Sequence, residues 1–328
     1  MFLKWGIHMR DNVRRVMRGF KFREQGVLLG FVFLVIVFSM INPNFFSLDN
    51  ILNMLRQSSI IGIIAMGMTF VIISGNFDIS VGGICALSGA VALQLMALDV
   101  PMVPAILCAV LVCTGVGFLN GVSVAKLGMP SLIATMAMMT VLSGAVRLVT
   151  GGYPVYTADE SYKAIASSSV GPIGIPIVYF VVCIAIAQFV LRKTKYGSSI
   201  YAVGGNEEAS RLSGIGVDRR KISVFVINGF AAGLAGIVLS SRVATATMTA
   251  GDGYELDAIA AVVIGGTSVS GGEGSAVRTV VGVLLMVIIG NILTMMRVDT
   301  FWQKVVKGLI IWLAVGFDSY NKKRLQKA

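Results

Sequence analysis

Long apolar runs, separated by short polar stretches, follow one another along the whole chain. Many of them approach or exceed about 18 residues, the length that a helix needs to cross a bilayer. We therefore expect an all-α, polytopic membrane protein of about ten transmembrane segments. The expected segments are Gly26–Ile41, Ile51–Ser74, Ile84–Leu98, Pro101–Val124, Ser131–Val149, Ile173–Val190, Ile222–Ser241, Glu255–Gly266, Ala276–Met296 and Phe301–Tyr320.

Two of these segments run into Gly-rich stretches that resemble each other. Ile73–Gly83 reads ISGNFDISVGG, and Ile264–Gly272 reads IGGTSVSGG. Glu255–Gly266 would be about 18 Å long as a helix, too short to cross the hydrocarbon without its Gly-rich extension. Paired interruptions in two halves of a chain point to a transport site near the midplane. Gly and Ser also occur where helices simply pack closely, and both interpretations stay open.

The basic residues give the expected orientation. Of the 27 Lys and Arg residues, seven precede Gly26, seven lie in the polar island Leu191–Lys221 and four follow Tyr320. Such clusters mark cytoplasmic segments, so we expect both termini inside the cell (N-in/C-in) and an even number of crossings. This divides the chain into a basic cytoplasmic tail, 1–25, a membrane domain, 26–320, with a cytoplasmic region at 191–221, and a second tail, 321–328.

The same distribution accounts for the net charge of +11 without nucleic acid, because no aromatic-rich basic patch of the nucleic-acid-binding kind is present. Catalytic signatures are also missing. The chain contains no GxxxxGK[ST], HExxH, CxxC or GxSxG, and its one histidine, His8, lies in the basic tail. The four cysteines (Cys85, Cys108, Cys113 and Cys183) fall in apolar segments at spacings that match no metal site. We expect core packing for them, no metal, no bound cofactor and no enzymatic activity.

A few polar residues inside the expected membrane segments are candidates for a translocation pathway: Asp78, Ser80, Asn120, Asp257 and Asn291. An ionised side chain is costly in a membrane and suggests function. The alternative is structural. Asp78 can cap the helix that starts near Ser80, Asp257 suits a helix N-terminus, and the two amides can bridge helices.

The polar island contains a short predicted helix, Glu207–Ser213. Asn206 can cap it, Glu207 and Glu208 fall in its first turn, and Gly214 can end it. A helix of about two turns does not stand alone in water and needs a surface to dock on. We interpret it as an element presented to a soluble partner; the alternative is a charged loop that only holds the topology.

Four passages extend this interpretation. They are SGNFDISVGG (Ser74–Gly83), YGSSIYAVGGNEEASRLSGI (Tyr196–Ile215), GYELDAIAAVVIGGTSVSGGEGS (Gly253–Ser275) and WQKVVKGLIIWLAVGFD (Trp302–Asp318). In them the chain resembles the permease subunit of bacterial ABC importers for monosaccharides, the ribose, xylose, arabinose and galactose class, which includes the autoinducer-2 permeases. The resemblance runs from about Phe45 to Tyr320.

This resemblance implies a multi-pass protein of the bacterial inner membrane that forms the sugar pathway. It implies two permease chains, identical or related, cytoplasmic ATPase subunits that bind ATP and Mg²⁺, and a periplasmic sugar-binding protein. The segment around the short helix is similar to the family's coupling helix, which contacts the ATPase. The residues concerned are Gly204, Gly205, Asn206, Glu207, Glu208, Ala209, Arg211, Leu212, Gly214 and Ile215. The competing hypotheses are an ion-coupled secondary transporter that uses Asp78 or Asp257, and a channel, for which no filter motif is present.

Overall fold

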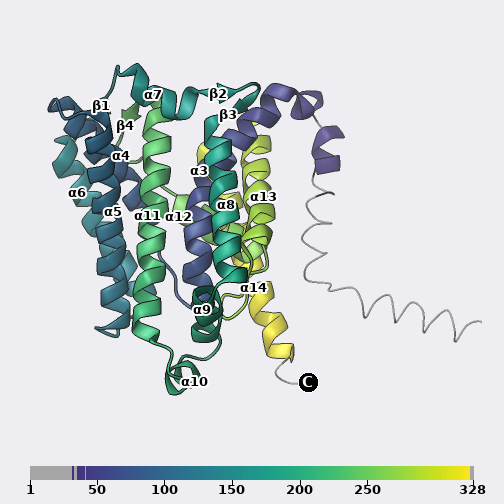
Figure 1. Ribbon diagram of the computed structural model, residues 1–328. Helices are drawn as coiled ribbons and strands as arrows, with labels where there is room; N and C mark the ends of the chain where they lie inside the picture. The colour runs from purple at the N-terminus through teal and green to yellow at the C-terminus, as the bar shows by residue number, and fades with distance from the viewer. Residues whose placement is uncertain (1–31, 33–34, 41, 326–328) are drawn as a thin grey trace, which may run out of the picture.

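The computed structural model describes residue 32, residues 35–40 and residues 42–325. The described part is a bundle of long helices (Figure 1). The helices are α3 (Leu48–Ile73), α4 (Val81–Ala97), α5 (Met102–Ala125), α6 (Ser131–Thr150), α7 (Glu160–Ser167), α8 (Ile175–Lys193), α9 (Lys195–Gly205), α10 (Glu207–Leu212), α11 (Val217–Val243), α12 (Tyr254–Ile264), α13 (Ala276–Met295) and α14 (Thr300–Leu325). A 3₁₀ turn, η1 (Pro43–Phe46), precedes α3.

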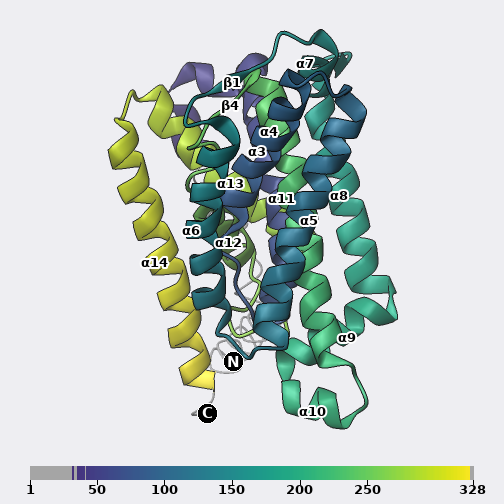
Figure 2. The ribbon, with the colours of Figure 1, turned by 90° about the vertical axis from the view of Figure 1, so that its left-hand side faces the viewer.

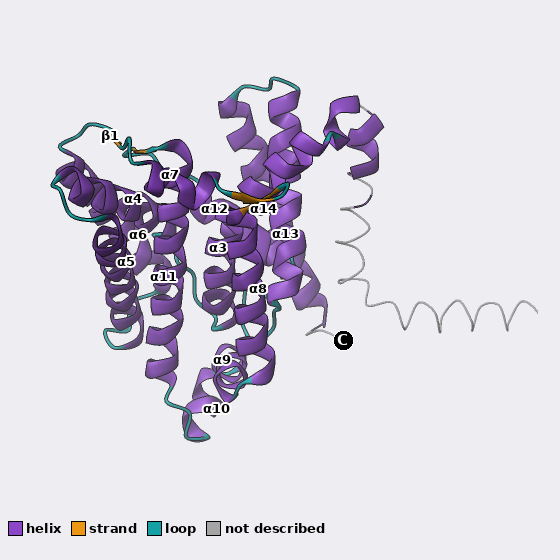
Figure 3. Cartoon of the chain, turned by 45° about the horizontal axis from the view of Figure 1, so that its top comes forward, coloured by secondary structure: helices purple, strands orange, loops and turns teal. Residues whose placement is uncertain are grey.

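Four two-residue strands pair as two antiparallel ribbons. They are β1 (Val155–Tyr156) with β4 (Thr245–Ala246), and β2 (Ser169–Val170) with β3 (Ile173–Gly174). The strands and α7 gather at one end of the bundle, and α9 and α10 lie at the opposite end (Figures 1 and 3). We call these the strand end and the α10 end. The last described turns of α14 also lie at the α10 end (Figure 2).

Helices α3 and α11 form the interior. In the most apolar 18-residue window of α3, 89% of the residues are buried, against 22% in α6 and α8. Helix α11 packs closely on its neighbours because it carries glycines where they meet. A methyl group on Gly229 would lie 2.6 Å from the carbonyl oxygen of Cys113 on α5, and one on Gly236 would lie 2.7 Å from Cβ of Ser88 on α4. Small residues at helix contacts are typical of membrane bundles.

Among the described residues, six helices are long and apolar enough to cross a membrane: α3, α5, α6, α8, α11 and α13. The chain is thus an all-α, multi-pass membrane protein. The other four predicted segments are not among these six helices, for different reasons. The first lies largely outside the described residues, α4 and α12 have 17 and 11 residues, and α14 carries Lys304 and Lys307 in its first half. The total of ten stays a prediction.

Several predicted boundaries are corrected. The chain between the predicted segments Ser131–Val149 and Ile173–Val190 forms α7, whose first turn is capped by Asp159. The island Leu191–Lys221 is mostly helical, because α8 continues to Lys193, α9 follows, and α11 begins at Val217 instead of Ile222. Cys108 is exposed on α5 and does not pack in the core, unlike Cys85 and Cys113. The basic tail, 1–25, lies outside the described residues.

Candidate functional site

Helix α10 has the local structure that the sequence predicts. Asn206 adopts an extended backbone (φ −160°, ψ 106°), and its side-chain oxygen accepts a hydrogen bond of 2.9 Å from the backbone N–H of Ala209. Glu207 and Glu208 follow in the first turn. The chain leaves the helix through Gly214 (φ 80°), a conformation that favours glycine. The capped helix, predicted as Glu207–Ser213, is confirmed with its end one residue earlier.

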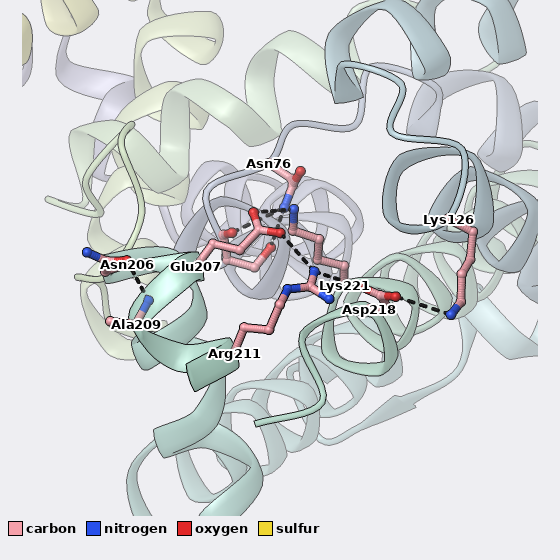
Figure 4. Close-up of polar contacts among 9 residues, drawn as sticks. Asn76, Lys126, Asn206, Glu207, Ala209, Arg211, Asp218 and Lys221 are labelled. Carbon is pink, nitrogen blue, oxygen red and sulfur yellow. Dashed lines mark hydrogen bonds and ion pairs between the residues drawn. The ribbon is translucent and has the colours of Figure 1, made fainter. Parts of the chain in front are cut away.

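Ion pairs fix this short helix to its neighbours (Figure 4). Glu207 Oε2 lies 2.6 Å from Lys221 Nζ, and Arg211 Nη2 lies 3.0 Å from Asp218 Oδ1 and 3.5 Å from Glu207 Oε1. Lys126, just beyond α5, completes the network with a distance of 3.1 Å to Asp218. Each exposed pair contributes at most about 1 kcal/mol. Together they connect α10 to the first turns of α11 and to the end of α5.

The network divides the residues of α10 into two sets. Glu207 and Arg211, both predicted as contacts for a partner, are engaged within the chain. Leu212 is 84% exposed, and Glu208 is exposed and makes no ion pair within the described residues. An apolar side chain this exposed on a polar, capped helix is suited to insert into another protein. The free face of α10 therefore presents Leu212 and Glu208.

Helix α9 was not predicted, although the sequence carries its signals. Thr194 accepts a hydrogen bond of 3.0 Å from the Gly197 N–H as the N-cap, and Ile200 and Val203 are buried at helical spacing. Tyr196 anchors the helix on α11, through a 2.6 Å hydrogen bond between its hydroxyl and that of Ser223. The glycines in this stretch (Gly197, Gly204 and Gly205) obscured the pattern.

Asp78 lies at the centre of a fully buried polar cluster that we call the Asp78 cluster: Asp78, Ser80, Asn120 and Asn228. One carboxylate oxygen accepts hydrogen bonds from the backbone N–H of Ser80 (2.9 Å) and its hydroxyl (2.6 Å), and the other accepts from the side-chain amide of Asn228 (3.0 Å). Asn120 donates to the Ser80 hydroxyl over 2.8 Å. The cluster joins the start of α4 to α5 and α11. Asp78 binds the N–H and hydroxyl of Ser80, the N-cap residue of α4, and so stabilises the turn before the helix without capping the helix itself. Asn228 was missed because it looks like one more polar residue of α11.

The other predicted pathway residues also make contacts between helices. Asp257, on α12, is 6% exposed in its side chain and lies 2.7 Å from Nζ of Lys307 on α14. The amide of Asn291 on α13 exchanges two hydrogen bonds with Asn50 on α3, at 2.8 and 3.1 Å. Of the five predicted pathway residues, Asp78, Ser80 and Asn120 therefore meet in the Asp78 cluster, whereas Asp257 and Asn291 have partners elsewhere. Their role in a pathway stays a prediction, while the structure gives each of them a bridging contact.

We find no group of three His, Cys, Asp or Glu side chains able to hold a metal within the described ranges. The arrangement has two notable parts, the short capped helix α10 held by ion pairs at one end of a membrane bundle and a buried polar cluster where α3 passes into α4.

Comparison with known proteins identifies the family. A family model described as "branched-chain amino acid transport system / permease component" matches residues 50–315. The ribose import permease protein RbsC of Haemophilus influenzae is 42% identical over 90% of this chain and 93% of its own length. RbsC of Escherichia coli K12 is 41% identical over 92% and 94% of the two chains. The L-arabinose ABC transporter permease protein AraH of Azospirillum brasilense is 38% identical over 93% and 90%.

No solved structure matches the chain. The region matched by the family model includes the two interrupted segments and also α9 and α10. The elements that form the candidate site therefore lie within the part of the chain that defines the family. The chain belongs to the family of ABC-importer permease components that contains the ribose and L-arabinose permeases.

Proposed function

We propose that this chain is the permease subunit of an ATP-driven importer for a monosaccharide or a related small polyol. The observation that carries the proposal is α10, a capped helix braced by ion pairs at one end of the bundle, with Leu212 exposed on its free face. A braced helix with an apolar anchor suits docking onto a soluble partner, and a permease without a phosphate-binding loop of its own needs a separate ATPase. The sugar class is carried over from the ribose and arabinose relatives.

The proposed assembly contains two permease chains, cytoplasmic ATPase subunits that hold ATP and Mg²⁺, and a periplasmic sugar-binding protein. It lies in the bacterial inner membrane, surrounded by lipid. Helix α10, together with the residues Gly204, Gly205 and Gly214 that flank it, is the coupling region on the cytoplasmic side. The permease supplies the pathway and takes no part in ATP hydrolysis.

We further propose ten crossings with both termini in the cytoplasm. The supporting observation is that α9, α10 and the last described turns of α14 lie at the same end of the bundle (Figure 2). Basic residues concentrate at this end, in the island Leu191–Lys221 that contains α9 and α10 and in the last turns of α14, as the positive-inside rule requires of a cytoplasmic face. Under this topology α4 and α12 cross together with the Gly-rich stretches that adjoin them.

Co-purification of the chain with its cognate ATPase tests the docking role. Leu212→Asp places a charge in the predicted apolar contact and is expected to weaken binding about 30-fold or more, the loss of an interface anchor. Leu127→Asp is the matched control, because Leu127 is also exposed, at 71%, between α5 and α6 at the α10 end. Equal binding by the Leu212→Asp variant and the unmodified chain would remove α10 from the interface.

An ion-coupled transporter is the competing function. It is favoured by one observation, that Asp78 is a buried carboxylate whose described partners are all neutral. Energy dependence separates the two. Uptake by an ATP-driven importer continues when the proton gradient is collapsed while ATP is maintained, whereas ion-coupled uptake stops.

A further inference from the structure

The end of α9 touches both interrupted segments of the membrane bundle. The two segments meet through a hydrogen bond of 2.9 Å from the Gly272 N–H to the carbonyl oxygen of Ile73. Gly204, in the last turn of α9, lies against this same pair. A methyl group on Gly204 would come within 2.7 Å of the Gly272 nitrogen and closer still to the Ile73 oxygen. No real side chain fits at such distances.

Two further contacts join α9 to the interrupted segments, one at Gly271 and one through Tyr201. A methyl group on Gly271 would lie 2.8 Å from the Gly204 carbonyl oxygen and equally close to Gly75 Cα. The hydroxyl of Tyr201, one turn back on α9, donates a hydrogen bond of 2.9 Å to the Gly274 carbonyl oxygen. Burial raises the pKa of Tyr201, so its phenol keeps the proton for this bond. Apart from the Tyr201 bond, the contacts are between backbones: Gly204 meets Ile73, Gly204 meets Gly271 and Gly272, and Gly75 meets Gly271. No flexible side chain lies between them.

This contact, which we call the glycine junction (Ile73–Gly75, Gly204 and Gly271–Gly272), lies directly beside the docking helix. Asn206 alone separates α9 from α10. On the far side, Ile73–Gly75 leads to the Asp78 cluster at the start of α4, and Gly271–Gly272 lies between α12 and α13. Because close-packed backbone deforms little, a displacement of α9 must displace both interrupted segments together.

We propose that Gly204 is a positioning residue for transport, through which movement of the docking helix reaches both interrupted segments. The proposal rests on the proposed function, because it takes α10 as the contact with the ATPase. Gly204 is proposed to act through its contact with the two interrupted segments. Its role is to let the end of α9 approach the two segments closely enough to move them as one.

The test is Gly204→Ala in the reconstituted complex of permease, ATPase and binding protein. The readout is sugar taken up per ATP hydrolysed, measured on complexes that have assembled. Gly216→Ala is the matched control, because Gly216 lies just before α11, outside the proposed coupling residues, and a methyl group there would meet only the Arg219 side chain, at 3.8 Å or more. We expect assembly to persist in both variants, and uptake per ATP to fall about tenfold or more in Gly204→Ala alone, since overpacking forces the backbones apart.

A second variant avoids added bulk. Tyr201→Phe removes only the partly buried hydrogen bond to Gly274, and it is expected to lower uptake per ATP about three- to fivefold, the contribution of one hydrogen bond of about 1 kcal/mol. If Gly204→Ala fails to accumulate in the membrane, Tyr201→Phe carries the test, and full coupling in that variant overturns the proposal.

The outcomes separate the two proposals. If the unmodified chain does not bind the ATPase, the proposed function fails, and the junction proposal fails with it. If the complex forms and Gly204→Ala transports as much sugar per ATP as Gly216→Ala, the junction proposal alone is wrong. Equal loss in both variants also overturns it, because the loss would then reflect a general sensitivity of the segments beside α10 to an added methyl group.

Discussion

Replacing Asp78 with alanine is expected to destabilise the protein strongly, because three buried donors lose their acceptor. These donors are the backbone N–H and hydroxyl of Ser80 and the side-chain amide of Asn228. A buried donor without a partner costs about 1–3 kcal/mol, so the three together cost about 3–9 kcal/mol. At about 2 °C for each kcal/mol, the melting temperature should fall by about 6 °C or more.

Asp78→Asn is the matched variant, since it keeps the shape and one oxygen for Ser80. Its new NH₂ group would face the amide nitrogen of Asn228. The amide oxygen of Asn228, however, is buried and makes no hydrogen bond with any described residue, so turning this amide over presents an acceptor to the new donor. The two hydrogen bonds from Ser80 lose their charge assistance at about 1 kcal/mol each, and the third is replaced by the reversed bond to the Asn228 oxygen, which was unsatisfied before; this predicts a fall of about 4 °C.

Thermal unfolding of the detergent-purified proteins measures both shifts, and uptake well below the melting temperatures measures function. If Asp78 serves as an acceptor that holds α4 against α5 and α11, Asp78→Asn transports sugar and Asp78→Ala is unstable. The reasoning is refuted if Asp78→Asn folds with a nearly unchanged melting temperature yet transports nothing. In that case the charge itself is required, and the ion-coupled hypothesis gains the residue that it needs.

Two further predictions concern contacts between helices. Lys307→Met leaves the carboxylate of Asp257 buried without its partner, which should lower the free energy of unfolding by about 3–5 kcal/mol. The double variant with Asp257→Leu should recover most of the lost melting temperature. A double variant as unstable as the single one would contradict this. Gly229→Val should lower the free energy of unfolding by about 1–3 kcal/mol, because α11 packs closely against Cys113 of α5. Gly115→Ala, on the open face of α5, should raise it by up to about 1 kcal/mol in the same unfolding assay. Equal shifts for the two glycines would show that the contact between α5 and α11 is not close-packed.

The membrane fold was predictable because a bilayer imposes one dominant requirement, a long apolar helix. The pattern located α5, α6 and α13 within a few residues, and the shortness of α12 was evident from the distance between Glu255 and Gly266. The local chemistry of α10 was predictable for a similar reason. An Asn cap and a terminal Gly act over one turn and need no tertiary context.

The partners of the charged residues were not predictable, because they depend on which helix ends lie side by side. Arg211 pairs with Asp218, seven positions later on a different helix, and no local pattern indicated this partner. Its predicted contact with another protein stays a prediction. Lys307 drew no attention in the sequence, yet it neutralises Asp257, fifty positions earlier. The sequence shows how many charged side chains a segment carries. Which of them pair with each other and which remain available to another protein depends on how the helices pack.

The two similar Gly-rich stretches show what local similarity alone leaves out. Read singly, each indicates a helix interruption, and the pair suggests a site near the midplane. In the structure they contact each other, and Gly271 and Gly272 also lie against a third backbone, the end of α9 with Gly204. The spacing of glycines along a chain records only that something approaches closely. Here the approaching element is the one that leads to α10, so the substitution that distinguishes packing from coupling is the one at Gly204, with Gly216 as the reference.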